Sequence, residues 1–251
     1  MNSAVNRVPR IVLLYWIIKI AATTLGETGA DMFSMTWSLG YGVTILLFLG
    51  LFAIAAGIKI ATRRYHPVLY WVTFTTSAIA GTAISDFIDR TLELGYALGS
   101  LVLVGLLAII LAAWYRSQRS LQVELITTAG AEIFYWLGFL VANTLGTAAG
   151  DYMADDLELG FITSALVLGG VLGAVALLQR FTKASRVALF WIAFVVTRPF
   201  GATFGDFLTK SRAQGGIALG TVVSSILFGA ALVIAVARET QLERRRVRQQ
   251  A

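Results

Sequence analysis

The sequence predicts an all-α membrane protein of eight transmembrane helices, built from four tandem copies of one two-helix unit. Three observations predict this fold: a very apolar composition, eight apolar segments of bilayer length, and a three-residue pattern that occurs four times. Of the 251 residues, 57% are hydrophobic and 14% are charged, and the mean hydropathy is +0.77. A water-soluble domain carries about 25% charged residues, so this chain lacks the polar surface that water requires.

Eight apolar segments are each about as long as the ~20 residues that cross a bilayer as a helix. They cover approximately residues 11–30, 42–60, 68–86, 96–115, 131–150, 160–178, 187–206 and 217–237. Period-two alternation is absent, so a membrane barrel is not expected. The first segment contains Lys19 and Glu27 and has no obvious cleavage site, so it is predicted to be a retained helix rather than a signal peptide.

The basic residues predict the orientation of the chain in the membrane. Fifteen of the 20 Lys and Arg residues lie before the first segment, around the ends of even-numbered segments or in the C-terminal tail. Because cytoplasmic loops are rich in Lys and Arg, both termini are expected in the cytoplasm. The basic tail is interpreted as a topology and lipid-surface signal, and no nucleic-acid partner is expected.

One pattern divides the chain into four repeats. Each odd-numbered segment has a tryptophan near its start, a glycine ten residues later and an aspartate fifteen residues later. The tryptophans are Trp16, Trp71, Trp136 and Trp191, the glycines are Gly26, Gly81, Gly146 and Gly201, and the aspartates are Asp31, Asp86, Asp151 and Asp206. Each unit has two spans, so the four copies are expected to point the same way, unlike the inverted repeats of many transporters.

The repeats also define the expected domains and helix layers. Two membrane halves, residues 1–120 and 121–238, match at an offset of 120 residues, and residues 239–251 form the basic tail. Each repeat glycine is followed four positions later by another small residue, a spacing that allows close helix packing. At about 100° per residue, the polar groups of the odd-numbered helices share one face. These helices are therefore predicted to form a pseudo-fourfold inner bundle, surrounded by the even-numbered helices.

Several polar groups lie at membrane depth, where ionisable side chains are costly and often mark function. Lys19, Glu27, Asn143 and Arg198 are candidates for substrate or proton handling. The alternative is a structural ion pair, formed by Glu27 with Lys19 or Arg198. The repeat tryptophans are interpreted as anchors at the inner interface, with a cytoplasmic gate as the alternative.

The four repeat aspartates lie at the outer ends of their helices. Together with Glu27 they could form an acidic vestibule that attracts a cation, as rings of carboxylates do in channels. The alternative is that they anchor helix ends in the headgroup region. Carboxylates and threonine hydroxyls are hard ligands that suit magnesium, calcium or manganese, so a metal site would consist of Asp31, Asp86, Asp151 and Asp206. Nearby methionines would suit cuprous copper but are more typical of packing.

The composition argues against most catalytic chemistry. Cysteine is absent and His66 is the one histidine, which leaves no zinc-finger, zincin or Ser-His-Asp site. No enzyme activity and no resident cofactor are therefore expected. The leading hypothesis is a cation transporter, with export of a divalent metal ion as its specific form. The alternatives are a membrane scaffold or sensor that acts through the tail, and a membrane enzyme; association into a homo-oligomer stays open.

The fourfold pattern of tryptophan, glycine and aspartate resembles a family of bacterial membrane proteins defined only by a tandem repeat of unknown function. The resemblance covers nearly the whole chain. The fourth repeat departs from the pattern after Asp206, where Lys210, Ser211 and Arg212 precede a shifted glycine, Gly220. The resemblance implies the bacterial cytoplasmic (inner) membrane and this architecture, but no activity.

Overall fold

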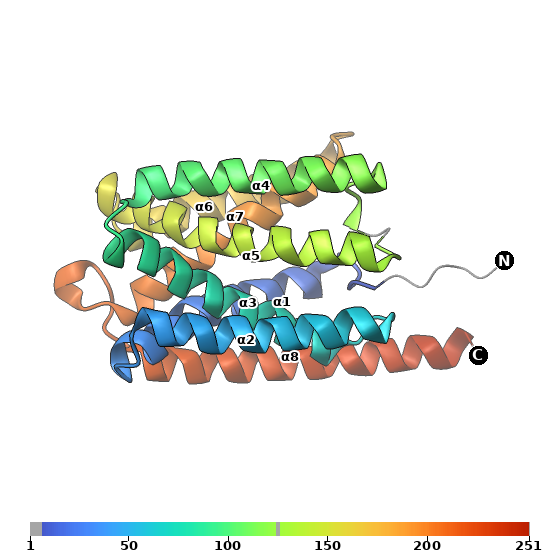
Figure 1. The fold of residues 1–251 in the computed structure, drawn as a ribbon, viewed down its shortest axis with the longest axis horizontal. Helices are drawn as coiled ribbons and strands as arrows, with labels where there is room; N and C mark the ends of the chain where they lie inside the picture. Colours follow the sequence, from blue (N-terminus) through green and yellow to red (C-terminus); the bar gives the residue numbers. More distant parts are fainter. Residues whose placement is uncertain (1–6, 124–125, 251) are drawn as a thin grey trace.

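The protein is described by a computed structural model that covers residues 7–123 and 126–250. Within these ranges the chain forms eight long helices and no β-strand (Figure 1), which confirms the all-helical prediction. The helices are α1 (Leu13–Asp31), α2 (Gly40–Thr62), α3 (Pro67–Asp86), α4 (Tyr96–Gln118), α5 (Ala129–Asp151), α6 (Phe161–Phe181), α7 (Arg186–Thr209) and α8 (Thr221–Gln250).

Seven of these helices, α2 to α8, are long and apolar enough to cross a membrane. This finding supports the prediction of a membrane protein. α1 is not among the seven, because its 19 residues include Lys19, Glu27 and Asp31. All three of these side chains are buried inside the protein. The crossing of the membrane by α1 therefore stays a prediction.

The helices form two layers. The inner layer is a ring in the order α1, α3, α5 and α7, in which each helix contacts the next and α7 contacts α1. Each even-numbered helix packs outside one of them: α2 on α3, α4 on α5, α6 on α7 and α8 on α1. In the apolar windows of α3, α5 and α7, 72%, 67% and 50% of the residues are buried, against 33% or less in the even-numbered helices. The odd-numbered helices thus form the inner bundle, as predicted.

The repeat glycines lie where neighbouring helices of this ring approach most closely. A β-carbon added to any of the four would lie 2.2 to 2.9 Å from the side chain that it faces. In every case that side chain is the seventh residue after the tryptophan of the next repeat around the ring. The contacts are Gly26 with Ala78, Gly81 with Asn143, Gly146 with Arg198, and Gly201 with Thr23. One packing contact is therefore used four times.

Three inner helices end in the same way directly after their repeat aspartate. α1, α3 and α5 pass into π-helical turns, η1 (Met32–Thr36), η2 (Phe87–Thr91) and η4 (Tyr152–Asp156). α7 instead continues to Thr209 and is followed by a 3-10 turn, η5 (Arg212–Gln214). The different end of the fourth repeat agrees with the departure of its sequence after Asp206.

Residues 239–250 of the expected tail are part of α8. This helix continues through Gln250, while residue 251 lies outside the described residues. The carboxylate of Glu239 accepts hydrogen bonds from the Tyr65 hydroxyl and the Trp71 indole, both at 2.6 Å. The first residue of the expected tail therefore fastens α8 to the inner bundle. The division into halves at residue 120 stays a prediction.

Candidate functional site

Arg198 on α7 joins all four inner helices at the centre of the bundle. Its two terminal nitrogens each lie 3.2 Å from one carboxylate oxygen of Glu27 on α1. The guanidinium also donates to the hydroxyls of Thr82 on α3 and Thr147 on α5. A further hydrogen bond of 3.3 Å reaches the carbonyl of Thr23 on α1. All four of its partners are buried, so this ion pair is shielded from solvent.

The repeat explains why these groups meet. Glu27, Thr82 and Thr147 are each the eleventh residue after a repeat tryptophan, and Ala202 holds this position in the fourth repeat. Aligning the four repeats at this position would have identified the two threonines as part of the site. Of the two ion pairs considered from the sequence, the one with Arg198 forms.

The four repeat aspartates lie at the end of the inner ring where α1, α3, α5 and α7 finish, and all are at least 97% buried. Two basic side chains each bridge two of them. The Lys210 ammonium lies 2.9 Å from Asp31 and 3.1 Å from Asp206. The Arg90 guanidinium lies 3.6 Å from Asp86 and 3.9 Å from Asp151.

Arg90 and Lys210 were not among the site residues predicted from the sequence. Each is the nineteenth residue after a repeat tryptophan and follows the aspartate of its own repeat by four positions. Residues four apart on a helix face the same side, and this spacing is the signal that could have identified them. Burial lowers the pKa of Lys210, but the carboxylates of Asp206 and Asp31 raise it by a larger amount. The pKa of Lys210 is therefore above its usual value. Lys210 is therefore a cation at neutral pH.

Part of this carboxylate cluster has no hydrogen-bond partner. Both oxygens of Asp86 and both of Asp151 are buried without a hydrogen bond in the described part of the chain. Glu27, Asp31 and Asp206 each direct one oxygen into a group whose members lie within 4.8 Å of one another. The structure thus brings three of the five predicted cation ligands into one compact group, and places the other two beside Arg90. Oxygen ligands of this kind suit a hard divalent cation.

Lys19 and Asn143 lie apart from the carboxylates. The Lys19 ammonium donates to the carbonyl of Phe194 at 2.6 Å and lies 3.7 Å from the centre of that ring. None of the ion pairs among the described residues involves Lys19. Asn143 donates to the hydroxyl of Ser77 at 2.9 Å and packs on Gly81. The sequence grouped both side chains with the central site, whereas each has its own local partners.

The position of Lys19 is aromatic in the other repeats. Its counterparts, three residues after each tryptophan, are Phe74, Phe139 and Phe194, whose ring centres lie 4.5 Å apart in successive pairs. Next to them, the hydroxyls of Tyr70 and Tyr135 are 2.5 Å apart. An aromatic layer therefore fills the inner ring between Arg198 and the end at which the repeat tryptophans lie. This layer is compatible with either role considered for the tryptophans, anchor or gate.

A second buried ion cluster lies beyond this aromatic layer and was not anticipated from the sequence. One carboxylate oxygen of Glu132 on α5 lies 3.0 Å from Arg7, and the other lies 2.8 Å from Lys59 on α2. The side chains of Lys59 and Glu132 are fully buried. These pairs fasten α2 and the segment before α1 to the inner bundle, which is a structural role.

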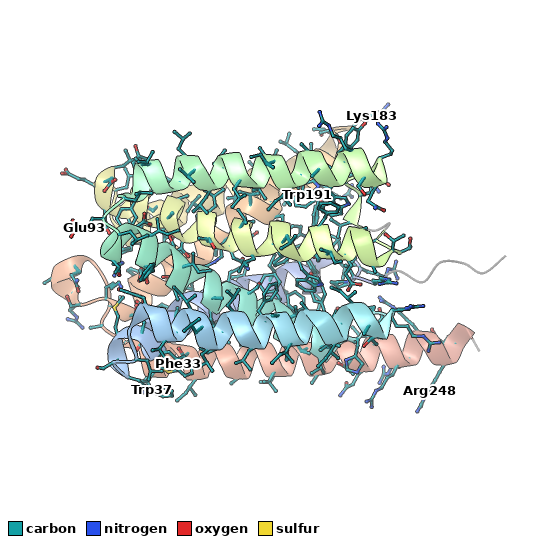
Figure 2. All side chains as sticks on the ribbon, in the orientation of Figure 1. Phe33, Trp37, Glu93, Lys183, Trp191 and Arg248 are labelled. Atoms are coloured by element: carbon teal, nitrogen blue, oxygen red, sulfur yellow. The ribbon has the colours of Figure 1, made fainter. Side chains whose placement is uncertain are left out.

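The two ends of the molecule differ in charge. Figure 2 shows Lys183 and Arg248 at one end of the bundle and Glu93 at the opposite end. Lys183 belongs to the α6–α7 connection and Arg248 to the end of α8. Glu93 belongs to the connection before α4. The predicted orientation rests on this separation of charge.

The fold and the site define a helical protein with a fourfold internal repeat, in which most helices suit a membrane and the inner ones share a buried ion cluster. Residues 14–65, 69–120, 134–185 and 189–245 match the family described as Repeat of Unknown Function (DUF347). The matches cover most of the chain, so the chain belongs to this family. Each match begins two residues before a repeat tryptophan, which confirms the predicted repeat. No curated protein and no solved structure matches the chain.

Proposed function

We propose that this protein is a cation transporter of the bacterial inner membrane, with eight spans in four parallel repeats and both termini in the cytoplasm. The position of α1 supports the eighth span, because α1 occupies the inner ring and directs its ionisable groups towards α3 and α7 rather than towards lipid. Its charged residues then need not contact hydrocarbon, which is where they would be costly.

One observation supports cation binding more than any other: the buried carboxylates at one end of the ring outnumber the cations that face them. Among the described residues, four aspartates and Glu27 are paired with only three basic groups, Arg198, Arg90 and Lys210. Buried charge without a partner is strongly destabilising. A bound cation, or protons, would compensate the excess negative charge. The unbonded oxygens of Asp86 and Asp151 are ready acceptors for either.

The same arrangement suggests how binding and release are coupled. Lys210 and Arg90 act as internal counter-ions, each of which a substrate cation displaces from its pair of aspartates. The cation is held by carboxylate oxygens from neighbouring helices, and protonation of those oxygens releases it. A hard divalent metal ion fits this oxygen-rich group best. Arg198, between the aspartates and the aromatic layer, holds the four inner helices in register. The aromatic layer closes the path from the cluster to the opposite end of the bundle.

The first test is a panel of cations added to purified protein, with thermal stability as the readout. A ligand that binds only the folded state raises its stability by mass action. One divalent cation is expected to stabilise the parent but not the variant with Asp31, Asp86, Asp151 and Asp206 all changed to Asn.

A matched control removes the same number of negative charges from the same end of the molecule. It carries Glu93→Gln, Asp155→Asn, Asp156→Asn and Glu158→Gln, which are exposed side chains outside the cluster. The control should keep the full response to the cation. An equal response from the parent, the control and the four-aspartate variant would refute the proposed site.

The surface of the α8 extension favours a second candidate function, that of a scaffold or sensor. Arg244, Arg245 and Arg248 border one shallow hollow on this helix, so the extension presents a basic surface to an anionic partner. Truncation after Thr240 would remove this surface and keep the Glu239 contacts. Loss of the cellular phenotype in this truncation, with the aspartates dispensable, would favour this function over transport.

A further inference from the structure

In each repeat, one position on the even-numbered helix faces a junction, the place where this helix meets a second inner helix beside the one on which it mainly packs. In the first three matched segments it is held by Lys59, Trp114 and Gln179, and its counterpart in the longer fourth segment is Glu239. Three of these side chains connect their helix to an inner helix on which it does not mainly pack. Lys59 pairs with Glu132 on α5, Trp114 packs edge-on against Trp191 on α7, and Glu239 bonds to Trp71 on α3.

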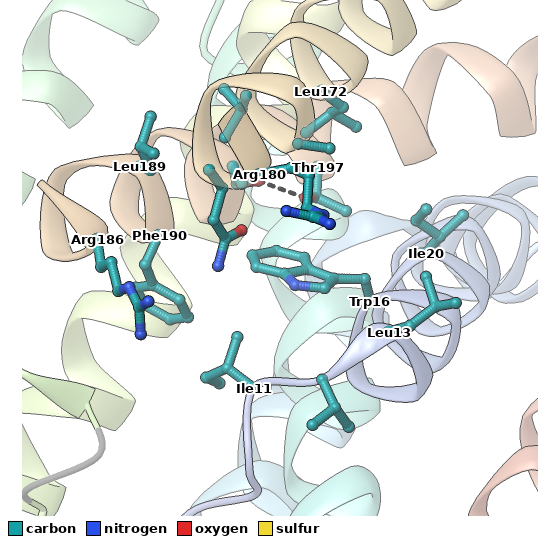
Figure 3. Close-up of a pocket in the computed structure, with 15 residues that line it drawn as sticks. Ile11, Leu13, Trp16, Ile20, Leu172, Arg180, Arg186, Leu189, Phe190 and Thr197 are labelled. Carbon is teal, nitrogen blue, oxygen red and sulfur yellow. Dashed lines mark hydrogen bonds between the residues drawn. The ribbon is translucent and has the colours of Figure 1, made fainter. Parts of the chain in front are cut away.

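The fourth junction, between α6 and α1, is different. Gln179 on α6 makes none of the hydrogen bonds found among the described residues, and it borders a hollow of about 690 Å³ between α1, α6 and α7 (Figure 3). The hollow is within the range of about 300–1,000 Å³ that is usual for small-molecule sites. α6 therefore leaves open the space that Trp114 fills at the equivalent place on α4.

The walls of this hollow are apolar and one end is basic. Trp16 on α1 and Leu172 and Val175 on α6 belong to its apolar lining. Arg180 and Arg186 are the only charged side chains that the described part of the chain contributes to this lining. Figure 3 shows Arg186 beside Phe190, whose ring packs against Trp16 with the ring centres 5.9 Å apart. A smaller hollow of about 280 Å³ adjoins it and shares Arg186. Among residues 7–123 and 126–250, no acidic side chain lines either hollow.

Within the part of the chain that the structure describes, Arg180 and Arg186 have no acidic partner. Neither takes part in the ion pairs formed within residues 7–123 and 126–250, and both side chains are exposed. They lie where α6 ends and α7 begins, so their guanidinium groups are at the level of the lipid headgroups if these helices cross the membrane. Basic pockets between transmembrane helices at this level bind anionic lipid headgroups. The apolar groove beside them suits an acyl chain.

We infer that the groove between α1, α6 and α7 binds one anionic phospholipid. The phosphate lies between Arg180 and Arg186, and an acyl chain lies along Trp16 and Leu172. At each of the other three junctions, a side chain connects the even-numbered helix to a second inner helix. At this junction the lipid takes the place of that side chain and connects α6 to α1. This site is at the opposite end of α1 from the aspartates, so it does not depend on the proposed transport.

The test compares phosphatidylglycerol with phosphatidylcholine on the full chain in detergent, with native mass spectrometry and thermal stability as readouts. The parent is expected to retain one phosphatidylglycerol and to gain stability from it, but not from phosphatidylcholine. Arg180→Gln combined with Arg186→Gln should weaken this binding about 30-fold, since each basic residue near an anionic headgroup contributes about fivefold. Gln179→Trp, which introduces the residue of α4, should fill the groove and abolish binding with both arginines present.

The control removes two exposed arginines near the same end of the bundle, Arg64→Gln with Arg116→Gln, and should bind the lipid like the parent. Equal retention of phosphatidylglycerol by the parent, the double-arginine variant and Gln179→Trp would overturn the inference. So would equal binding of the two lipids by the parent. Stabilisation by inorganic phosphate alone to the same extent would also overturn it, because it would show an anion site without a lipid.

Discussion

At the scale of single residues, Arg198 shows how one residue that occurs in only one repeat organises the other three. The equivalent positions are Thr23, Ala78 and Asn143, and none of these can reach the ring axis with a positive charge. Arg198 contacts α1, α3 and α5 at once, and it is the direct partner of the Glu27 carboxylate. Its loss would leave that buried carboxylate without its cation.

Changing Arg198 to Met tests this role. Breaking a buried ion pair from one side costs about 3–5 kcal/mol, because the remaining charge is uncompensated. The free energy of unfolding in detergent micelles should fall by about this amount. Combining Arg198→Met with Glu27→Gln should recover much of the loss. If the single variant unfolds like the parent, Arg198 does not hold the ring together.

Lys210 gives a second prediction for a single residue. Lys210→Gln leaves Asp31 and Asp206 without the ammonium that lies 2.9 and 3.1 Å from them. Unpaired buried polar groups cost about 1–3 kcal/mol, and charged ones more, so the variant should unfold more easily at neutral pH. A divalent cation that takes the place of the ammonium should restore the stability. Lys183→Gln, on the exposed connection before α7, should change neither quantity.

At the scale of the helices, the sequence predicted the number and order of the elements well and their ends less well. Apolar length located all eight long helices, since such segments are stable in lipid only as helices. The helical extension of α8 was missed because residues 239–250 are polar, and apolar length cannot detect a polar helix. The contacts of Glu239 with Tyr65 and Trp71 depend on neighbours that are distant in sequence.

The glycine contacts give a prediction at this scale. A methyl group at position 81 would lie 2.9 Å from the β-carbon of Asn143 and 3.0 Å from the backbone nitrogen of Thr144, which cannot move without shifting α5. Gly81→Ala should therefore destabilise the protein by about 1–3 kcal/mol, as overpacking usually does. Gly50→Ala, where nothing lies within 4 Å, should change the stability by no more than about 1 kcal/mol in either direction. Comparable unfolding of both variants would contradict the proposed packing of the inner ring.

At the scale of the whole molecule, the sequence predicted the inner ring but only part of its ion cluster. The repeat spacing placed four aspartates at one level of four equivalent helices. The structure groups Asp31 and Asp206 with Glu27, and places Asp86 and Asp151 beside Arg90. The bridging by Arg90 and Lys210 could not be predicted, because each also pairs with the aspartate of a neighbouring repeat. That pairing depends on the order of the helices around the ring, which one sequence does not specify.

The topology gives a prediction for the whole molecule. The start of α1 and the end of α8 lie at the same end of the bundle (Figure 1). If α1 crosses the membrane, a position just before this helix and a position just after it lie on opposite sides of the membrane. Single cysteines introduced as Val12→Cys and Ser38→Cys test this, because the sequence has no other cysteine. A membrane-impermeant thiol reagent added to intact cells should label the Ser38→Cys variant and not the Val12→Cys variant. Labelling of both variants, or of neither, would mean that α1 does not cross and that only the seven apolar helices span the membrane.

The central claim is that the buried carboxylates carry a cation across the membrane. Flux of the cation selected by the stability panel, measured in proteoliposomes, tests it most directly. The parent and the variant with Glu93, Asp155, Asp156 and Glu158 neutralised should transport it, and the four-aspartate variant, folded and reconstituted to the same level, should not. Equal flux through the parent and the four-aspartate variant, or no flux above empty liposomes through the parent, would contradict the claim.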